Sequence, residues 1–304
     1  MKVISLGWGV QSWTLAAMAA LGHIEADLAI HADTLHEKSE TYAFAKQWTP
    51  WLEAKGLRVV TVSDEKQAAK VTTSKTDMPA FTLGERKLIR LLDEPDADEL
   101  DEEEVYDTQA DIPGFNYNEG RPPVFTLSPH GKSGQLRRQC TGRWKVQPIR
   151  RYITSELAER GIRKAPGCVE SLQGISLDEW QRMKDSDVKW IVHRYPLVEM
   201  KMTRADCEAW LRAHDLPIPP KSACVFCPFQ SINAWRELKR TGGPDWKKAV
   251  EIDAAIRNVR PPYQLFVHPT RIALPEAITI PEDAGFSQAT MFDGDGCESG
   301  YCFV

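Results

Sequence analysis

Short apolar runs alternate with longer stretches of helical composition through the first 63 residues. The run that begins at Val3, residues 28–32 and the β-branched residues 58–63 are typical of buried parallel strands. Residues 13–21, rich in Ala, Leu and Met, and residues 40–55 between these runs predict helices. A βαβαβ order of this kind predicts an α/β fold with a doubly wound, Rossmann-like parallel sheet.

The same pattern returns after an interruption. Residues 168–175 and 190–197 predict two further strands, and Thr203 is the expected N-cap of a helix over 203–213. Residues 233–240 and 246–257 predict two more helices. We expect an α/β domain over 1–215 and a smaller cysteine-containing region over 216–304.

The interruption spans residues 71–134 and predicts an insertion that forms a mobile flap. It contains a predicted helix near residues 85–92 and then ten acidic residues, with no basic one, between Asp93 and Asp107. The net charge of −5 is therefore a local feature of this run. The run indicates a solvated segment, with docking of a partner as the alternative.

Composition restricts the class of protein. With 42% apolar residues among 304, the chain can bury a full core. No apolar run approaches the roughly 20 residues of a membrane span, and the first 20 residues lack a basic signal-peptide region, so we expect a cytoplasmic protein without a membrane partner. Seven cysteines, unevenly spread, favour metal or redox chemistry over a disulfide scaffold.

The segment 3–12, VISLGWGVQS, predicts a strand, a turn and a helix N-terminus. Gly7 and Gly9 permit positive φ and close backbone approach, and amides at a helix start bind anions. Gln11 and Ser12 add neutral donors. The segment fits neither GxxxxGK[ST] nor GxGxxG, so it predicts a different phosphate site or, alternatively, only a tight connection.

Polar residues also follow the second predicted strand. They are His31, Asp33, Thr34, His36, Glu37, Glu40 and Thr41. Ligands of open α/β sheets bind beyond the carboxyl ends of the strands, where these residues and the first turn meet. Helix capping by Ser39 is the alternative and accounts for only one polar position.

These two segments resemble the PP-loop family. SLGWGVQS is similar to SGGxDS, with Gly7, Gly9, Gln11 and Ser12 on the matching positions. Gly7 stands where the first Ser is usual, Trp8 where the first Gly is usual, and Gln11 where Asp is common. ADTLHEKSET resembles the DTG-x-x-x-x-ET segment of phosphoadenosine-phosphosulfate (PAPS) reductases, with Leu35 in place of Gly. The residues in register there are Asp33, Thr34, Glu40 and Thr41.

Two later segments extend the resemblance. GQLRRQCTGRWKVQPIRR, residues 134–151, is similar to CCxxRKVxPL through Cys140, Arg143, Lys145, Val146 and Pro148, with Gln139 at the other cysteine position. GISLDEWQRM resembles G-x-R-x-x-E-x-x-R through Gly174, Glu179 and Arg182, with Ser176 replacing an Arg. The basic residues suit pyrophosphate or a nucleic-acid backbone; a solvated helix face is the alternative.

Cys224 and Cys227 form a C-x-x-C pair that is followed by proline. Its spacing fits a zinc knuckle, a dithiol redox pair or half of an iron–sulfur site. The resemblance implies a [4Fe–4S] cluster, with zinc as the alternative, held by Cys224, Cys227, Cys140 and Cys297. Cys302 is the other choice for the fourth position, and either tail cysteine is alternatively a sulfur carrier or a spectator.

The whole chain resembles the PAPS reductase family of PP-loop proteins, especially its phage-encoded and DNA-phosphorothioation members. This resemblance implies an ATP pyrophosphatase that uses Mg²⁺ and adenylates an acceptor for sulfur transfer. The acceptor would be DNA, tRNA or a small molecule, and the donor a cysteine desulfurase or thioredoxin-like protein. The implied catalytic residues are Lys145, Arg143 and Arg182. The implied nucleotide-binding residues are Ser5, Gly7, Gly9, Gln11, Ser12, Asp33, Thr34, Glu40 and Gly174.

Two other functions fit the same residues. One is true PAPS reduction by a C-terminal thiol, which predicts sulfite release with thioredoxin and no need for ATP. The other is a non-catalytic nucleic-acid-binding module that uses the basic segment 137–151.

Overall fold

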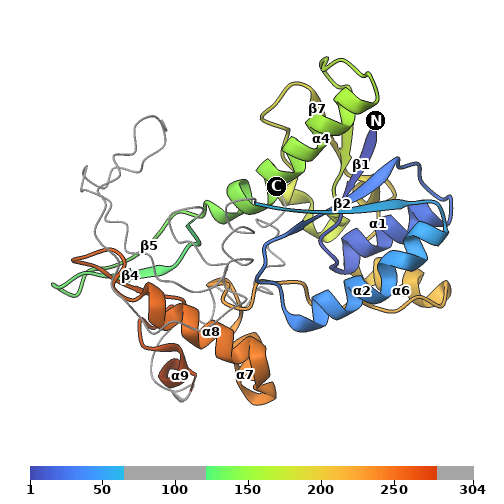
Figure 1. Cartoon of the computed structure of the whole chain (residues 1–304). Coiled ribbons are helices and arrows are strands. Elements are labelled where there is room, and N and C mark those ends of the chain that lie inside the picture. The colour runs from blue at the N-terminus through green and yellow to red at the C-terminus, as the bar shows by residue number, and fades with distance from the viewer. Residues whose placement is uncertain (65–120, 279–304) are drawn as a thin grey trace, which may run out of the picture. The chain divides into compact units, whose positions relative to one another are not determined.

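The computed structural model of the chain describes residues 1–64 and 121–278 (Figure 1). Contacts divide the chain into two compact units. Their described parts are residues 1–64 with 144–224 in the first unit, and residues 121–143 with 225–278 in the second. The sequence-based boundary at residue 215 stays a prediction.

The first unit is built on a five-stranded parallel sheet, which confirms the predicted fold class. Its strands are β1 (Lys2–Ser5), β2 (Leu28–Asp33), β3 (Arg58–Ser63), β6 (Val169–Leu172) and β7 (Ile191–Arg194). Their order across the sheet is β3-β2-β1-β6-β7. Val3, in the central strand, pairs with Leu28 on one side and with Ser171 on the other.

Alternate residues of these strands supply two hydrophobic layers. Ile4 and Ala29 pack with α1 (Val10–Ala20), α2 (Ser39–Ala54) and α6 (Arg204–Ala213). Val3, Leu28 and Ile30 instead pack with α4 (Gln147–Glu159). Helices therefore cover both faces of the sheet, so its strands are apolar on both sides (Figure 1).

The strand order reverses direction next to β1. From β1 the chain adds β2 and then β3 on one side, and it later adds β6 and β7 on the other. In doubly wound sheets the loops that leave two such neighbouring strands diverge, and they open a crevice beyond the strand ends. The crevice of this unit is thus expected between the segments that follow Ser5 and Leu172.

Glu156 of α4 fastens that helix to the edge of the sheet. The Glu156 carboxylate is paired with the Arg58 guanidinium of β3, and it accepts hydrogen bonds from Tyr152 Oη at 2.8 Å and Arg160 Nε at 2.8 Å. The hydrogen bond from Arg58, with those from Tyr152 and Arg160, lowers the pKa of Glu156 to about 2. The ionised carboxylate therefore stabilises the folded state.

Replacing Glu156 by Gln is expected to make the free energy of unfolding depend less on pH at acid pH. A folded-state pKa of about 2 lies below the ordinary value of 4.5, so the stabilisation is complete above about pH 4.5 and is lost as the pH falls toward 2. At neutral pH the variant should lose roughly 1.5–3 kcal/mol of unfolding free energy, as for hydrogen bonds to charged groups. Urea unfolding between pH 3 and pH 7 tests this, with the exposed Glu159→Gln as control. Wild-type and Glu156→Gln curves that run parallel with pH would contradict it.

The second unit contains a small antiparallel sheet in the order β5-β4-β8. Its strands are β4 (Phe125–Leu127), β5 (Ser133–Gln135) and β8 (Gln264–Phe266), and its helices include α7 (Ile232–Thr241), α8 (Gly243–Ile256) and α9 (Leu274–Ala277). The buried Asp253 joins them, because its carboxylate accepts from the amides of Val267 at 2.9 Å and Leu274 at 3.0 Å. A single side chain of α8 thus fixes the segments around β8 and α9.

Most predicted elements in the described residues form. Thr203 caps α6, where its hydroxyl accepts from the Asp206 amide at 3.2 Å in a capping box. The alternative of a helix cap at Ser39 is wrong: Ser39 is the first residue of α2, and Lys38 holds the cap position without a side-chain hydrogen bond. The proposed helix 85–92, the acidic run and the tail cysteines lie outside the described residues. Among the helices that are described, none is both long and apolar enough to cross a membrane.

Candidate functional site

The turn between β1 and α1 presents the amides of a helix start. Gly9 is the N-cap of α1 and offers it no side chain, and the first hydrogen bond of the helix joins Trp13 N to Gly9 O at 2.9 Å. The amides of residues 10–12 precede that bond, so the helix itself gives them no acceptor. Ser12 stabilises the turn, because its hydroxyl donates to Gly9 O at 3.2 Å and accepts from Gly7 N at 3.1 Å. The turn can therefore hold an anion.

The backbone of this turn corrects one expectation. The residue with positive φ is Trp8, at 58°, whereas Gly9 has an extended φ of −89°. The Trp8 side chain is 1% exposed and packs against Trp13 and Phe44, with ring centroids 6.0 and 6.1 Å away. This packing holds a conformation that costs a bulky residue of the order of 1–3 kcal/mol. Trp8 therefore belongs to the core and not to the lining of the site.

A pocket lies beside the turn, at the crevice between β1 and β6. It contains about 620 Å³ of space free of atoms, part of it open to solvent. Its walls come from the end of β1, the start of α1, the segment after β6, the helix η3 (Leu177–Arg182), the start of α6 and the segment 220–222. Six predicted residues line it: Ser5, Gly9, Gln11, Ser12, Gly174 and Arg182.

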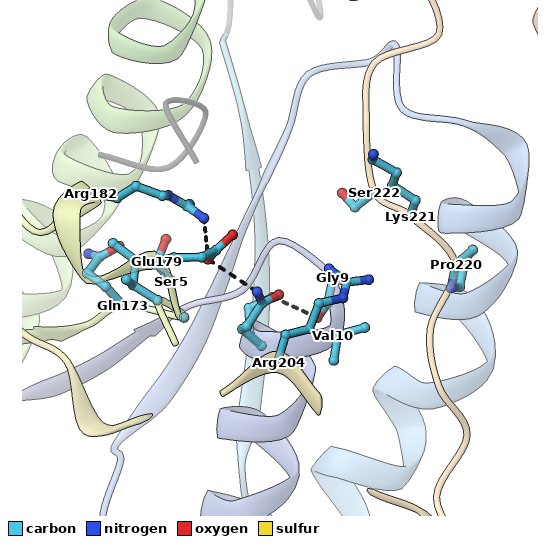
Figure 2. Close-up of a pocket in the computed structure, with 14 residues that line it drawn as sticks. Ser5, Gly9, Val10, Gln173, Glu179, Arg182, Arg204, Pro220, Lys221 and Ser222 are labelled. Atoms are coloured by element: carbon cyan, nitrogen blue, oxygen red, sulfur yellow. Dashed lines mark hydrogen bonds and ion pairs between the residues drawn. The ribbon is translucent and has the colours of Figure 1, made fainter. Parts of the chain in front are cut away.

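Basic side chains dominate the charge of the pocket. Arg182, Arg204 and Lys221 line it, against one carboxylate, that of Glu179. Figure 2 shows Glu179 and Arg182 on one side of the view and Lys221 on the other, with Gly9 between them. Three cations next to a helix N-terminus make the pocket suited to a group with several negative charges.

The single carboxylate is held in place by its neighbours. Glu179 is ion-paired with Arg182, and it accepts a hydrogen bond from Gln11 Nε2 at 3.2 Å (Figure 2). Burial raises the pKa of Glu179, and the positive charge of Arg182 opposes that rise. We expected the Gln11 amide to face a ligand. It instead donates to Glu179 and to Ser176 Oγ, the latter at 3.4 Å.

Gly174 has a packing role that its motif did not reveal. A Cβ at this position would lie 2.7 Å from Ser12 N and 2.9 Å from Ser12 Cα, closer than atoms can approach. Only glycine lets the segment after β6 lie against the first turn of α1. A Cβ at Gly9, in contrast, would meet nothing within 4 Å.

A second group of predicted residues gathers at the end of β2. Asp33 Oδ1 accepts from Leu35 N and from Tyr42 Oη, both at 2.7 Å. Burial and the neighbouring Asp33 carboxylate raise the pKa of Tyr42, so its hydroxyl stays neutral and donates. Lys145 Nζ lies 3.4 Å from Glu37 Oε1.

Thr34 belongs to this second group and contacts one of the predicted metal ligands. Its hydroxyl lies 3.4 Å from Glu37 Oε1 and 3.3 Å from Cys224 Sγ. Glu40 is more peripheral: it is exposed at the start of α2 and lies 3.9 Å from Lys38 Nζ.

The predicted metal ligands are divided between the units. Cys224 belongs to the first unit, whereas Cys140, Cys227 and the catalytic candidate Arg143 belong to the second. Cys297 lies outside the described residues. Within residues 1–64 and 121–278, no group of three or more His, Cys, Asp or Glu side chains is placed to hold a metal ion. The cluster therefore stays a prediction.

Sequence reasoning missed five residues that contribute to these two groups. Glu179 matched a motif but was not assigned a role, and Glu37 was noted only as a polar residue after a strand. Lys221 and Ser222 precede the C-x-x-C pair, and Arg204 follows a helix cap; nothing local distinguishes them. Only folding brings residues 204 and 221 to the start of α1.

Comparison with known proteins adds little to this geometry. No family model and no curated protein match the chain. A similar solved structure is the crystal structure of phosphoadenylyl-sulfate (PAPS) reductase from Candida auris in a phosphate complex, with a TM-score of 0.36 and 14% sequence identity. The match covers 72% of this chain and 74% of that chain. At this TM-score the likeness carries no functional weight, and what the site does follows from its own residues.

Proposed function

We propose that the chain is a PP-loop enzyme that binds ATP in the pocket beside β1 and α1, transfers adenylate to an acceptor and releases pyrophosphate. The observation that carries the proposal is the combination of helix amides at residues 10–12, which have no acceptor within α1, with three cationic side chains in one pocket. A dinucleotide fingerprint and a Walker loop are both missing from the turn. The motifs shared with PAPS reductases support the adenine nucleotide.

Adenylate transfer requires that the leaving pyrophosphate be stabilised. The acceptor oxygen attacks the α-phosphorus, the bond from that phosphorus to the bridging oxygen breaks, and negative charge builds on the departing group. The amides of the turn stabilise this charge, as does Arg182. Lys145 and Arg143 are further proposed sources of positive charge, by their motif.

Adenylation of the acceptor is proposed to prepare it for sulfur transfer. An adenylated oxygen is a good leaving group: a sulfur nucleophile from a donor protein can form a bond to the acceptor while the adenylated oxygen leaves as AMP. DNA, tRNA or a small molecule is the proposed acceptor, and the phage-encoded or DNA-phosphorothioation branch is the proposed affiliation. Mg²⁺, which binds largely through phosphate oxygens, would neutralise the nucleotide.

Pyrophosphate release from ATP tests the proposal. Wild-type protein supplied with Mg²⁺ and acceptor should release pyrophosphate from ATP, and it should release AMP when a sulfur nucleophile then displaces the adenylate. Release of sulfite from PAPS with thioredoxin, without any requirement for ATP, would favour PAPS reduction instead. Salt-sensitive nucleic-acid binding that survives loss of Ser12, without either activity, would favour a binding module.

Metal analysis tests the proposed cluster. Protein purified without oxygen should be brown and contain iron and sulfide if Cys140, Cys224, Cys227 and Cys297 hold a [4Fe–4S] cluster. Replacing Cys227 by Ser should then remove most of the iron. Replacing Cys207 by Ser should leave the iron content unchanged, because Cys207 is fully buried in the core of the first unit. Stoichiometric zinc without iron would overturn the iron–sulfur assignment.

A further inference from the structure

Glu37 occupies a buried position that no motif explains. Its side chain is 1% exposed, and it follows β2 in a turn where Leu35 has a φ of 64°. Tyr42 fixes this turn, because its hydroxyl donates to Asp33 and accepts from Glu37 N at 3.3 Å. The turn therefore directs the Glu37 carboxylate into the protein.

Two segments that are distant in the sequence, those of Lys145 and Ser222, reach this carboxylate together with Thr34 of the same turn. Oε1 faces Thr34 Oγ1 and Lys145 Nζ, each at 3.4 Å, and Oε2 accepts from Ser222 Oγ at 3.4 Å. The segment of Ser222 is also tied to this turn by a bond from Lys38 N to Ala223 O at 3.2 Å. Since Ser222 lines the pocket, Glu37 connects the wall of the pocket to the Lys145 ammonium.

The stability of the fold does not by itself explain the buried pair of Glu37 and Lys145. A buried ion pair commonly stabilises a protein no better than an apolar pair of the same size, because both charges lose their hydration. The separation of 3.4 Å is also longer than the roughly 2.7–2.9 Å of a tight charge-assisted hydrogen bond. The carboxylate thus lies beside the ammonium without forming a tight charge-assisted hydrogen bond.

We propose that Glu37 is a positioning residue, which holds Lys145 ready for the phosphates and links its position to occupancy of the pocket through Ser222. This inference rests on the proposed function for its effect on catalysis, but the contact between Glu37 and Lys145 can be tested without activity. Glu37 acts through Lys145, so it is not itself a catalytic residue.

Two measurements on the full chain test the proposal. The first is the rate at which acetic anhydride modifies Lys145, followed by mass spectrometry with and without inorganic pyrophosphate. Glu37→Gln retains the shape of the side chain but not its charge. In this variant the rate of Lys145 modification should change at least about fivefold, and adding pyrophosphate should no longer alter that rate. Glu53→Gln, at an exposed carboxylate of α2, should leave both unchanged.

The second measurement is a double-mutant cycle on pyrophosphate release. Glu37→Gln should lower kcat about thirtyfold or more with KM for ATP changed less than about threefold, because a positioning effect appears mainly in the transition state. The double variant Glu37→Gln, Lys145→Gln should be no slower than Lys145→Gln alone. Effects that multiply in the double variant would overturn the proposal, because Glu37 would then act independently of Lys145.

The outcomes separate this proposal from the proposed function. If wild-type protein releases no pyrophosphate from ATP, the proposed function fails, and the modification rate of Lys145 alone decides the role of Glu37. An unchanged modification rate in Glu37→Gln overturns the positioning role, whatever the activity. A changed rate accompanied by unfolding, seen as a lost thermal transition, overturns it as well, because Glu37 would then be a structural residue.

Discussion

A Gly9→Val variant is expected to lose pyrophosphate binding and pyrophosphate release by at least about thirtyfold, equivalent to about 2 kcal/mol. The extended φ and ψ of Gly9, −89° and 171°, suit valine, and an added Cβ meets nothing within 4 Å. The side chain would instead stand where an anion approaches the amides of residues 10–12. The measurements are calorimetric titration with pyrophosphate and the rate of pyrophosphate release from ATP.

The thermal transition and a smaller substitution control this experiment. Gly9→Val should melt within a few degrees of wild type, because a valine N-cap costs a helix only about 1 kcal/mol relative to a favourable one. Gly9→Ala should show an intermediate loss of binding. Wild-type affinity and rate in the valine variant would remove the turn from the mechanism.

Replacing Arg182 by Met is expected to weaken pyrophosphate binding by about a hundredfold or more, because a cation and its bidentate hydrogen-bonding capacity leave the pocket. The change also leaves Glu179 without its ion-pair partner. Burial already raises the pKa of Glu179, and loss of the opposing charge of Arg182 raises it further. The affinity that the variant loses relative to wild type at the same pH should therefore become smaller as the pH falls and Glu179 is protonated.

Arg182→Lys is the matched control, since it keeps the charge and loses the planar fork. It should bind pyrophosphate with an affinity between those of the wild type and Arg182→Met. Titrations at pH 5 and pH 8 measure the pH dependence. Equal affinity in all three proteins would show that the phosphates bind elsewhere.

The turn after β1 could be predicted from the sequence because its features are local. An apolar run, two glycines and a helix start follow one another within ten residues, and the parallel order of the strands places their ends together. The conformation of Trp8 could not be predicted, because packing against Phe44, 36 positions later, decides it. The cap at Ser39 could not be decided locally either, because Lys38, which holds the cap position, is bonded through its amide to Ala223, far along the chain.

The second half of the site depends on contacts between distant residues. Ser222 and Glu37 are 185 positions apart, and Lys145 and Glu37 are 108 apart. No periodicity or spacing records such contacts, and a polar residue after a strand can equally well bond to the local backbone as a helix cap. For the same reason the C-x-x-C pair predicts two ligands of a metal site but not where the others come from.

The close contact between Gly174 and Ser12 has a mechanical consequence. Because there is no room for even a methyl group between them, the first turn of α1 cannot move toward the chain that leads into η3 without displacing it. A ligand that pushes the amides of residues 10–12 in that direction therefore also displaces the segment that carries Glu179 and Arg182.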